Sequence, residues 1–111
     1  MAGVYELKSN DRGEFSFVLK AANGLVVLRS QQYASKATAM SGIASVQSNS
    51  ASADRYEKLV ASDGRHYFNL KAGNQQVVGT SQMYATPSAR DEGIASVMAN
   101  GPGSAVTEPA A

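Results

Sequence analysis

The amino-acid sequence contains the same unit twice, and this duplication restricts the possible folds more than any other feature. Residues 5–49 align with residues 56–100 without a gap, and 20 of the 45 aligned pairs are identical. This identity lies far above the level expected for unrelated residues, so the repeat decides the architecture before any single motif does. Each unit is expected to form one supersecondary structure that packs against the other.

The first half of each unit has the period of β-strands. Large apolar residues occupy every second position there, which marks one buried face because side chains alternate across a strand. The residues that carry this pattern in the two copies are Phe15, Phe17 and Leu19, and His66, Phe68 and Leu70. Turn-forming residues divide the pattern into three strands in each copy.

The second half of each unit has the period of a helix. In the first copy Ala39, Ile43 and Val46 recur at spacings of four and three. They form an apolar stripe, to which Met40 is expected to contribute. The second copy has Arg90 and Asp91 near the start of this stretch but retains Ile94, Val97 and Met98. One helix is therefore expected at the end of each unit.

Both helices are expected to begin at equivalent positions. Ser35 is a residue type that caps helix N-termini, and Thr86 does the same before Pro87, which is well tolerated at the first helical position. Gly42 and Gly93 lie inside the expected helices, where glycine costs roughly 1 kcal/mol relative to alanine. Close packing of each helix against the sheet or against the other helix is the expected compensation.

A unit of this size buries too little surface to be stable alone, and its sheet would have open edges. We therefore predict an α+β fold in which tandem β-β-β-α repeats, residues 4–49 and 55–100, share one antiparallel-rich sheet. The sheet would have about six strands, with two helices on one face and a pseudo-twofold axis. Residues 1–100 would form this single domain, and residues 101–111 a flexible tail of glycine, proline and small residues. A short strand formed by the last few residues of the tail is the alternative.

Three stretches of the second copy resemble the YegP-like family of small bacterial tandem-repeat proteins. They are residues 68–72, 81–84 and 93–98, and residues 42–46 of the first copy repeat the last of them. The resemblance covers residues 4 to about 101. It implies a fold in which β-β-β-α-β units share one sheet and exchange a terminal strand. It implies little about activity, and no catalytic residues carry over.

Composition excludes several kinds of chemistry. The chain has no cysteine and a single histidine, so thiolate catalysis, disulfides and multi-histidine metal sites cannot be built. His66 lies on the expected apolar face, where a structural ring is favoured over a general base. No serine-hydrolase elbow or phosphate loop is present. We therefore expect a protein that is not an enzyme and that uses no cofactor and no metal.

The chain gives no sign of a membrane or of secretion. Its N-terminus lacks the basic start and apolar run of a signal peptide, and no segment approaches the roughly 18 apolar residues of a membrane span. The net charge of +1 supplies no global attraction for nucleic acid or anionic lipid. We expect a cytoplasmic protein, monomeric, with the two repeats forming an internal pseudo-dimer.

The candidate binding surface is the sheet face that the helices leave open. Lys20 and Lys71 are expected there because they follow the apolar positions of their strands. Tyr67 and Asn69 are expected beside them. The alternative interpretation is a solvated face on which the lysines pair with shared glutamates. Two shared tyrosines just before the helices are further candidates, although packing over the helix start is favoured for both: Tyr33 and Tyr84.

Two functions follow from this surface. The favoured one is a non-catalytic binding or interaction module that uses the open sheet face or a sheet edge, with a protein as its possible partner. The alternative is nucleic-acid binding, in which lysines and Tyr67 contact phosphates and bases. Positions where the copies differ are equally legitimate candidates: His66, Tyr67, Arg90 and Asp91.

Overall fold

Each copy of the repeat forms three strands followed by one helix. The computed structural model describes residues 3–21, 24–102 and 105–107. The first copy comprises β1 (Val4–Ser9), β2 (Phe15–Lys20), β3 (Val26–Arg29) and α1 (Lys36–Asn49). A short 3-10 helix, η1 (Ala53–Arg55), leads into β4 (Tyr56–Val60), β5 (His66–Lys71), β6 (Val77–Thr80) and α2 (Pro87–Asn100). The last described element is β7 (Ala105–Thr107).

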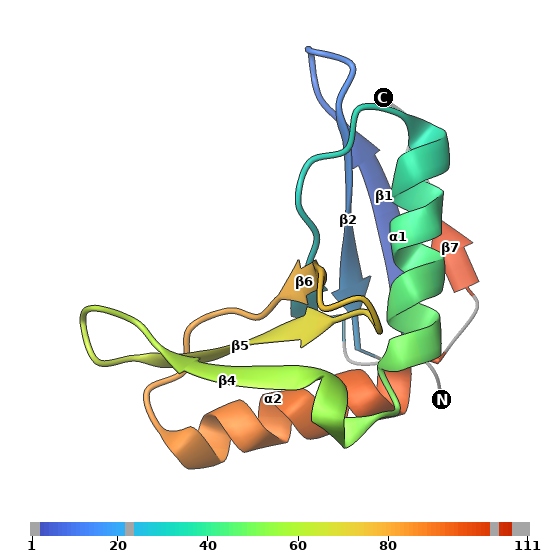
Figure 1. Ribbon diagram of the computed structural model, residues 1–111. Helices are drawn as coiled ribbons and strands as arrows, with labels where there is room; N and C mark the ends of the chain where they lie inside the picture. The colour runs from blue at the N-terminus through green and yellow to red at the C-terminus, as the bar shows by residue number, and fades with distance from the viewer. Residues whose placement is uncertain (1–2, 22–23, 103–104, 108–111) are drawn as a thin grey trace.

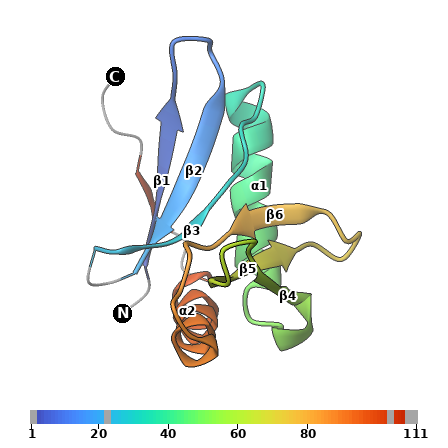
Figure 2. The same cartoon turned by 90° about the vertical axis from the view of Figure 1, so that its left-hand side faces the viewer.

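All these strands belong to one sheet, in the order β4-β5-β6-β3-β2-β1-β7. The two copies join where β3 pairs antiparallel with β6, at Arg29 opposite Thr80. These two residues are 51 positions apart and are therefore counterparts in the repeat. The pseudo-twofold axis passes between them, which confirms the shared sheet predicted from the duplication. Figures 1 and 2 show the resulting sheet, which twists so strongly that the β1–β2 hairpin and the β4–β5 hairpin run in different directions.

Both helices pack on one face of the sheet, and they meet near their C-terminal ends (Figure 1). Helix α1 runs beside β1 and β2, whereas α2 runs beside β4 and β5. Apolar side chains from both copies merge into a single core, because each helix also reaches across to the strands of the other copy. The fully buried residues of that core include Tyr5, Phe17, Leu19, Val46, Phe68, Leu70 and Val97.

The expected helix starts are confirmed. The Ser35 hydroxyl accepts a hydrogen bond from the Thr38 N–H at 3.2 Å, and the Thr86 hydroxyl accepts one from the Ala89 N–H at 3.0 Å. Pro87 is the first residue of α2. The apolar stripe of α1 is narrower than predicted, because Met40 is exposed.

The glycines inside the helices are confirmed as sites of close packing. A Cβ atom at Gly42 would overlap the Tyr33 ring, and one at Gly93 would overlap the Tyr84 ring, whose Cζ atom would lie 2.6 Å away. Each helix therefore approaches the sheet closely enough to cover a tyrosine. The lack of a side chain allows this contact, and the contact offsets the unfavourable helix propensity of glycine.

The C-terminal segment differs from the prediction. Residues 101–111 were expected to form a flexible tail, but Ala105–Thr107 form β7, which pairs in parallel with β1. The sheet consequently has seven strands rather than about six. Residues 103–104 and 108–111 of the expected tail lie outside the described residues. Because β7 follows the second copy and pairs with β1 of the first, one half of the strand exchange implied by the family resemblance is present, while β4 has no strand on its outer side among the described residues.

Candidate functional site

The open face of the sheet carries one continuous row of side chains that runs across all seven strands. Cross-strand pairing aligns these residues one after another, and the row passes through the pseudo-twofold axis. From β7 to β4 the row consists of Thr107, Glu6, Val18, Arg29, Thr80, Asn69 and Glu57. Its two glutamates are counterparts in the repeat and lie near opposite ends of the sheet.

Each glutamate of this row binds the candidate lysine of its own copy. The Lys20 ammonium lies 2.9 Å from Glu6, and the Lys71 ammonium lies 3.1 Å from Glu57. These lysine hydrogen bonds are the main cause that lowers the pKa of both glutamates below its ordinary value. The lysines therefore offer little unpaired positive charge. This pairing is the one expected for a solvated sheet face, and it gives the nucleic-acid alternative no support.

Asn69 extends the pairing of the second copy into a small network. Its amide donates to Glu57 at 3.3 Å and accepts from the Thr80 hydroxyl at 2.8 Å. The first copy has Val18 and Arg29 at the equivalent positions. The open face is therefore not symmetric, and its polar network belongs to the second copy.

The six candidate residues do not converge on one groove. Tyr67, Asn69 and Lys71 share one face of β5, and Lys20 lies on the same sheet face across the pseudo-twofold axis. The two tyrosines lie on the helix face instead: Tyr33 stacks on Phe17, and Tyr84 stacks on Phe68, with ring planes inclined by 10° in both pairs. As binding residues, all six remain predictions.

His66 has no general-base geometry. Its Nδ1 atom is buried and has no hydrogen-bond partner among the described residues. The backbone of His66 pairs with that of Tyr84 through two hydrogen bonds of 2.8 and 2.7 Å. The backbone of this residue thus holds the segment before α2 against the sheet.

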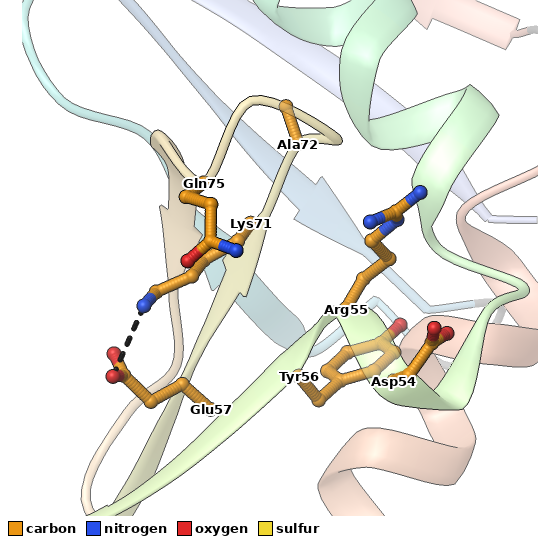
Figure 3. A pocket seen from close by; sticks show the side chains of 7 residues that line it. All are labelled: Asp54, Arg55, Tyr56, Glu57, Lys71, Ala72 and Gln75. Atoms are coloured by element: carbon orange, nitrogen blue, oxygen red, sulfur yellow. Dashed lines mark hydrogen bonds and ion pairs between the residues drawn. The ribbon is translucent and has the colours of Figure 1, made fainter.

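A polar hollow of about 260 Å³ lies beside the Glu57–Lys71 pair (Figure 3). Figure 3 shows Arg55 extending from the end of η1 toward the turn that carries Ala72, while Gln75 lies above Lys71. Gln75 has φ +72°, the left-handed conformation that glycine adopts at the equivalent turn of the first copy. The hollow is lined by two acidic and two basic residues, so it has no net charge to select an anion.

The two outer strands of the repeat differ in what covers them. Strand β1 has β7 on its outer side, with Tyr5 opposite Val106. Its counterpart β4 is an edge strand, with no further strand beyond it among residues 3–21, 24–102 and 105–107. The Ala61 N–H donates to the Arg65 C=O. Because hydrogen-bonded pairs alternate in an antiparallel ladder, the backbone groups of Tyr56, Lys58 and Val60 must point outward from β4.

Part of that outward edge is already occupied. The Tyr56 N–H is bonded to the C=O of Ala53 in η1. The N–H and C=O of Lys58, in the middle of β4, point away from β5, and no strand lies beyond β4 in the described part of the chain. Outward groups of this kind form a template for an additional strand.

A second hollow, of about 150 Å³, adjoins this edge on the helix side of β4. It is lined by Ala53, Tyr56, Lys58, Asp91 and Ile94. The Lys58 ammonium lies 3.5 Å from the Asp91 carboxylate. Arg90 also holds Asp91, at 3.0 Å, and its hydrogen bond is the largest of the causes that keep the pKa of this carboxyl below its ordinary value.

The sequence indicated a sheet edge as one candidate surface but did not identify residues 56–60 as that edge. Two differences between the copies could have identified it: Lys58 corresponds to Leu7, and Asp91 corresponds to Met40. Leu7 is buried, whereas Lys58 and Asp91 pair with each other beside the uncovered strand. A buried leucine in the first copy and an exposed, ion-paired lysine at the same position of the second indicate that the second copy lacks the cover that the first copy has.

Neither a metal site nor a membrane span is found in the described residues. They contain no group of three or more His, Cys, Asp or Glu side chains that could hold a metal ion. None of their helices is both long enough and apolar enough to cross a membrane.

Comparison with known proteins matches both copies of the repeat to one family, described as "Domain of unknown function (DUF1508)". The matched residues are 10–57 and 61–108. The chain belongs to this family. A relative with the same repeat, the UPF0339 protein YegP of Escherichia coli (strain K12), is 57% identical over 101 residues, which cover 91% of this chain and 92% of that protein. The resemblance to YegP-like proteins is thereby confirmed.

Further relatives extend the family to other bacteria. A UPF0339 protein in the ptx operon 5'region of Stutzerimonas stutzeri is 44% identical over 108 residues, covering 97% of both chains. The solution NMR structure of yegP from E. coli, titled a protein of unknown function, has a TM-score of 0.92 at 55% identity and covers 97% of this chain and 93% of its own. The UPF0339 protein of Shewanella oneidensis gives 0.91 at 52% identity, with coverages of 97% and 92%. These structures confirm the α+β fold.

Proposed function

We propose that this DUF1508 protein is a non-catalytic interaction module that binds an extended peptide segment of a protein partner by strand addition to β4. The observation that carries the proposal is the difference between two equivalent strands. Strand β1 binds β7 along its outer edge, and β4 presents the same edge without a described strand on it. Backbone pairing along a sheet edge supplies affinity for extended peptides without any catalytic group.

The proposal favours the edge over the open face because of the charges on that face. Both shared lysines are held by glutamates, so a ligand on the face would have to replace existing ion pairs. At the edge, by contrast, the backbone groups of Lys58 point outward, and no strand of the described residues lies beyond them. An incoming strand would gain hydrogen bonds there without breaking a described one.

An alternative role for Lys58 is protection. Lysine is common on natural edge strands, where it deters unwanted pairing between molecules. In this protein, however, the ammonium is directed to Asp91, and the backbone remains accessible. The two roles differ in their consequences, because removing a protective lysine causes copies of the chain to associate, whereas removing an incidental one does not.

The test uses two substitutions at one position. Lys58→Pro and Lys58→Ala both remove the ion pair with Asp91, but only proline removes the outward N–H. Because that N–H faces away from β5, both variants are expected to keep the folded spectrum. The probe is a blocked synthetic peptide with the sequence of residues 104–108, which contains β7. Binding is followed by amide chemical shifts of the labelled, intact chain.

The proposal predicts that the peptide shifts the amide signals of β4 in the wild type and in Lys58→Ala, and not in Lys58→Pro. Two outcomes contradict it: no shift in β4 at millimolar peptide, or equal binding by the proline and alanine variants. If Lys58→Ala instead self-associates with rising concentration and binds no peptide, the lysine protects the edge and the proposal is wrong.

A further inference from the structure

The hollow beside β4 has a counterpart in the first copy, and there it is filled. Four of its lining residues, Tyr56, Lys58, Asp91 and Ile94, correspond to Tyr5, Leu7, Met40 and Ile43. In the first copy Val106 of β7 lies opposite Tyr5 and packs against the core that contains Tyr5, Leu7 and Ile43. One strand residue therefore covers this part of the first copy, while the corresponding place in the second copy is open.

We infer that the hollow formed by Ala53, Tyr56 and Ile94 is a side-chain pocket that selects a branched aliphatic residue of the peptide added to β4. This inference rests on the proposed function, and it names the ligand class of the same site. We expect a branched aliphatic residue because Val106, which is of this type, lies beside β1, the strand equivalent to β4.

The size and lining of the hollow fit such a residue. A volume of about 150 Å³ accepts a branched aliphatic side chain, since cavities of roughly this size hold small apolar molecules. Three of the five lining residues present carbon surface, namely Ala53, the Tyr56 ring and Ile94. An apolar side chain placed there loses contact with water, which is the main source of affinity for a pocket of this kind.

The polar lining residues limit what else can enter. Lys58 and Asp91 already form an ion pair, and Arg90 further compensates Asp91. A charged ligand side chain would compete with this arrangement and would also lose its hydration. The neighbouring residues of an added strand point to the opposite face, toward Glu57 and Lys71, where small or polar side chains such as those flanking Val106 are accommodated.

The position of η1 sets where the added strand lies. Because Ala53 accepts the Tyr56 N–H, the new strand cannot repeat the β1–β7 register at its first residue. It pairs with the outward groups of Lys58 instead. Ala53 thereby has two roles, in that it closes one end of the edge and forms one wall of the pocket.

The experiment combines a peptide series with a filled pocket. The parent peptide again has the sequence of residues 104–108, and three further peptides replace its valine with glycine, aspartate or isoleucine. The valine and isoleucine peptides are expected to bind at least about tenfold more tightly than the other two, a difference of about 1.4 kcal/mol, since only their side chains place apolar surface in the pocket. Affinities are measured from amide shift titrations of the intact chain.

The protein variant is Ala53→Leu, which fills the pocket from η1 without altering the outward groups of β4. Its matched control is Ala51→Leu, at an exposed position that does not line the hollow. Ala53→Leu is expected to reduce the affinity for the valine peptide to that for the glycine peptide, while Ala51→Leu leaves the preference intact.

The outcomes separate the two proposals. If all peptides bind to β4 with equal affinity, or if Ala53→Leu keeps the preference for valine, the pocket inference is wrong while strand addition stands. If no peptide perturbs β4, strand addition itself is wrong. Tighter binding of the aspartate peptide would show that the charges of Lys58 and Asp91, and not the apolar wall, determine which peptide is selected. That result would overturn the inference.

Discussion

Leu28 lies directly over Gly79, and the two residues are each other's counterparts in the repeat. A Cβ atom at Gly79 would lie only 2.6 Å from Leu28 Cδ2. The pseudo-twofold axis passes through this region, so a symmetric sequence would direct two leucines into the same space. Ser50 and Gly101 show the same relationship where the helices end, because a Cβ atom at Gly101 would overlap the Ser50 side chain.

The duplication has therefore lost its symmetry where the two copies meet. At both places one copy supplies a side chain and the other supplies a glycine. A fused chain can carry such a difference, whereas two identical chains cannot, since both would have the same residue at that position. The two copies are now complementary parts of one core.

Exchanging Leu28 and Gly79 tests this complementarity. Gly79→Leu alone is expected to lower the free energy of unfolding by about 1–3 kcal/mol, because the new side chain overpacks the core. The double variant Leu28→Gly with Gly79→Leu should be less destabilised than the sum of its two single variants. Urea denaturation of all four proteins gives the coupling energy. Additive effects would show that the two positions do not share one space.

Residues 1–53 expressed alone are expected to remain unfolded. A symmetric dimer of this fragment would place Leu28 against Leu28 and Arg29 against Arg29, which adds steric overlap and like-charge repulsion to the cost of association. Circular dichroism and sedimentation over a range of concentrations provide the measurement. A folded dimer would contradict the complementarity described above, and a folded monomer would contradict the shared core.

Gly42→Ala tests the contact between α1 and Tyr33. In an exposed helix this change would stabilise by up to about 1 kcal/mol. Here the new methyl group would lie 2.8 Å from Tyr33 Cζ and 3.0 Å from Phe17 Cε2, so we expect a decrease in the free energy of unfolding. Ser41→Ala, at an exposed position of the same helix, serves as the control and should be neutral or slightly stabilising. Stabilisation by Gly42→Ala would refute the close packing.

The ion pair on the open face predicts a specific pH dependence. The pKa of Glu57 lies below its ordinary value of 4.5, chiefly because Lys71 donates a hydrogen bond to the carboxylate. The pair therefore contributes stability above pH 4.5, and this contribution is lost as the pH falls through the lower pKa of the folded state. Lys71→Gln should raise the pKa of Glu57 in a carboxyl NMR titration. Lys20→Gln, the matched control, should raise that of Glu6 and leave Glu57 unchanged.

Much of the fold was predictable because its determinants are local or repeated. Alternating apolar residues such as Phe17 and Leu19 mark their strands, and Ser35 and Thr86 mark the helix starts. The gapless duplication indicates that both copies share one sheet. The strand β7 was not predictable in this way, because three residues in a glycine- and proline-containing segment show no periodicity. Residues 105–107 form a strand because β1 lies beside them and offers a partner for their backbone hydrogen bonds.

The candidate site was less predictable for a related reason. Sequence alternation places Lys71 and Asn69 on the open face, but it does not show that Glu57 binds both. Which strand lies at the edge depends on two non-local contacts, the join between Arg29 and Thr80 and the docking of β7 on β1. The sequence differences at Lys58 and Asp91 acquire a meaning only once these contacts are known.

Amide hydrogen exchange at Lys58 and Tyr5 tests the central claim most directly, because these amides report the edges of the two equivalent strands. In the free protein we expect the Tyr5 amide, which faces β7, to be protected, and the Lys58 amide to exchange rapidly. Adding the peptide with the sequence of residues 104–108 should slow exchange at Lys58 and leave Tyr5 unchanged. A Lys58 amide that is already protected in the free protein, or that still exchanges rapidly at saturating peptide, would contradict strand addition at β4.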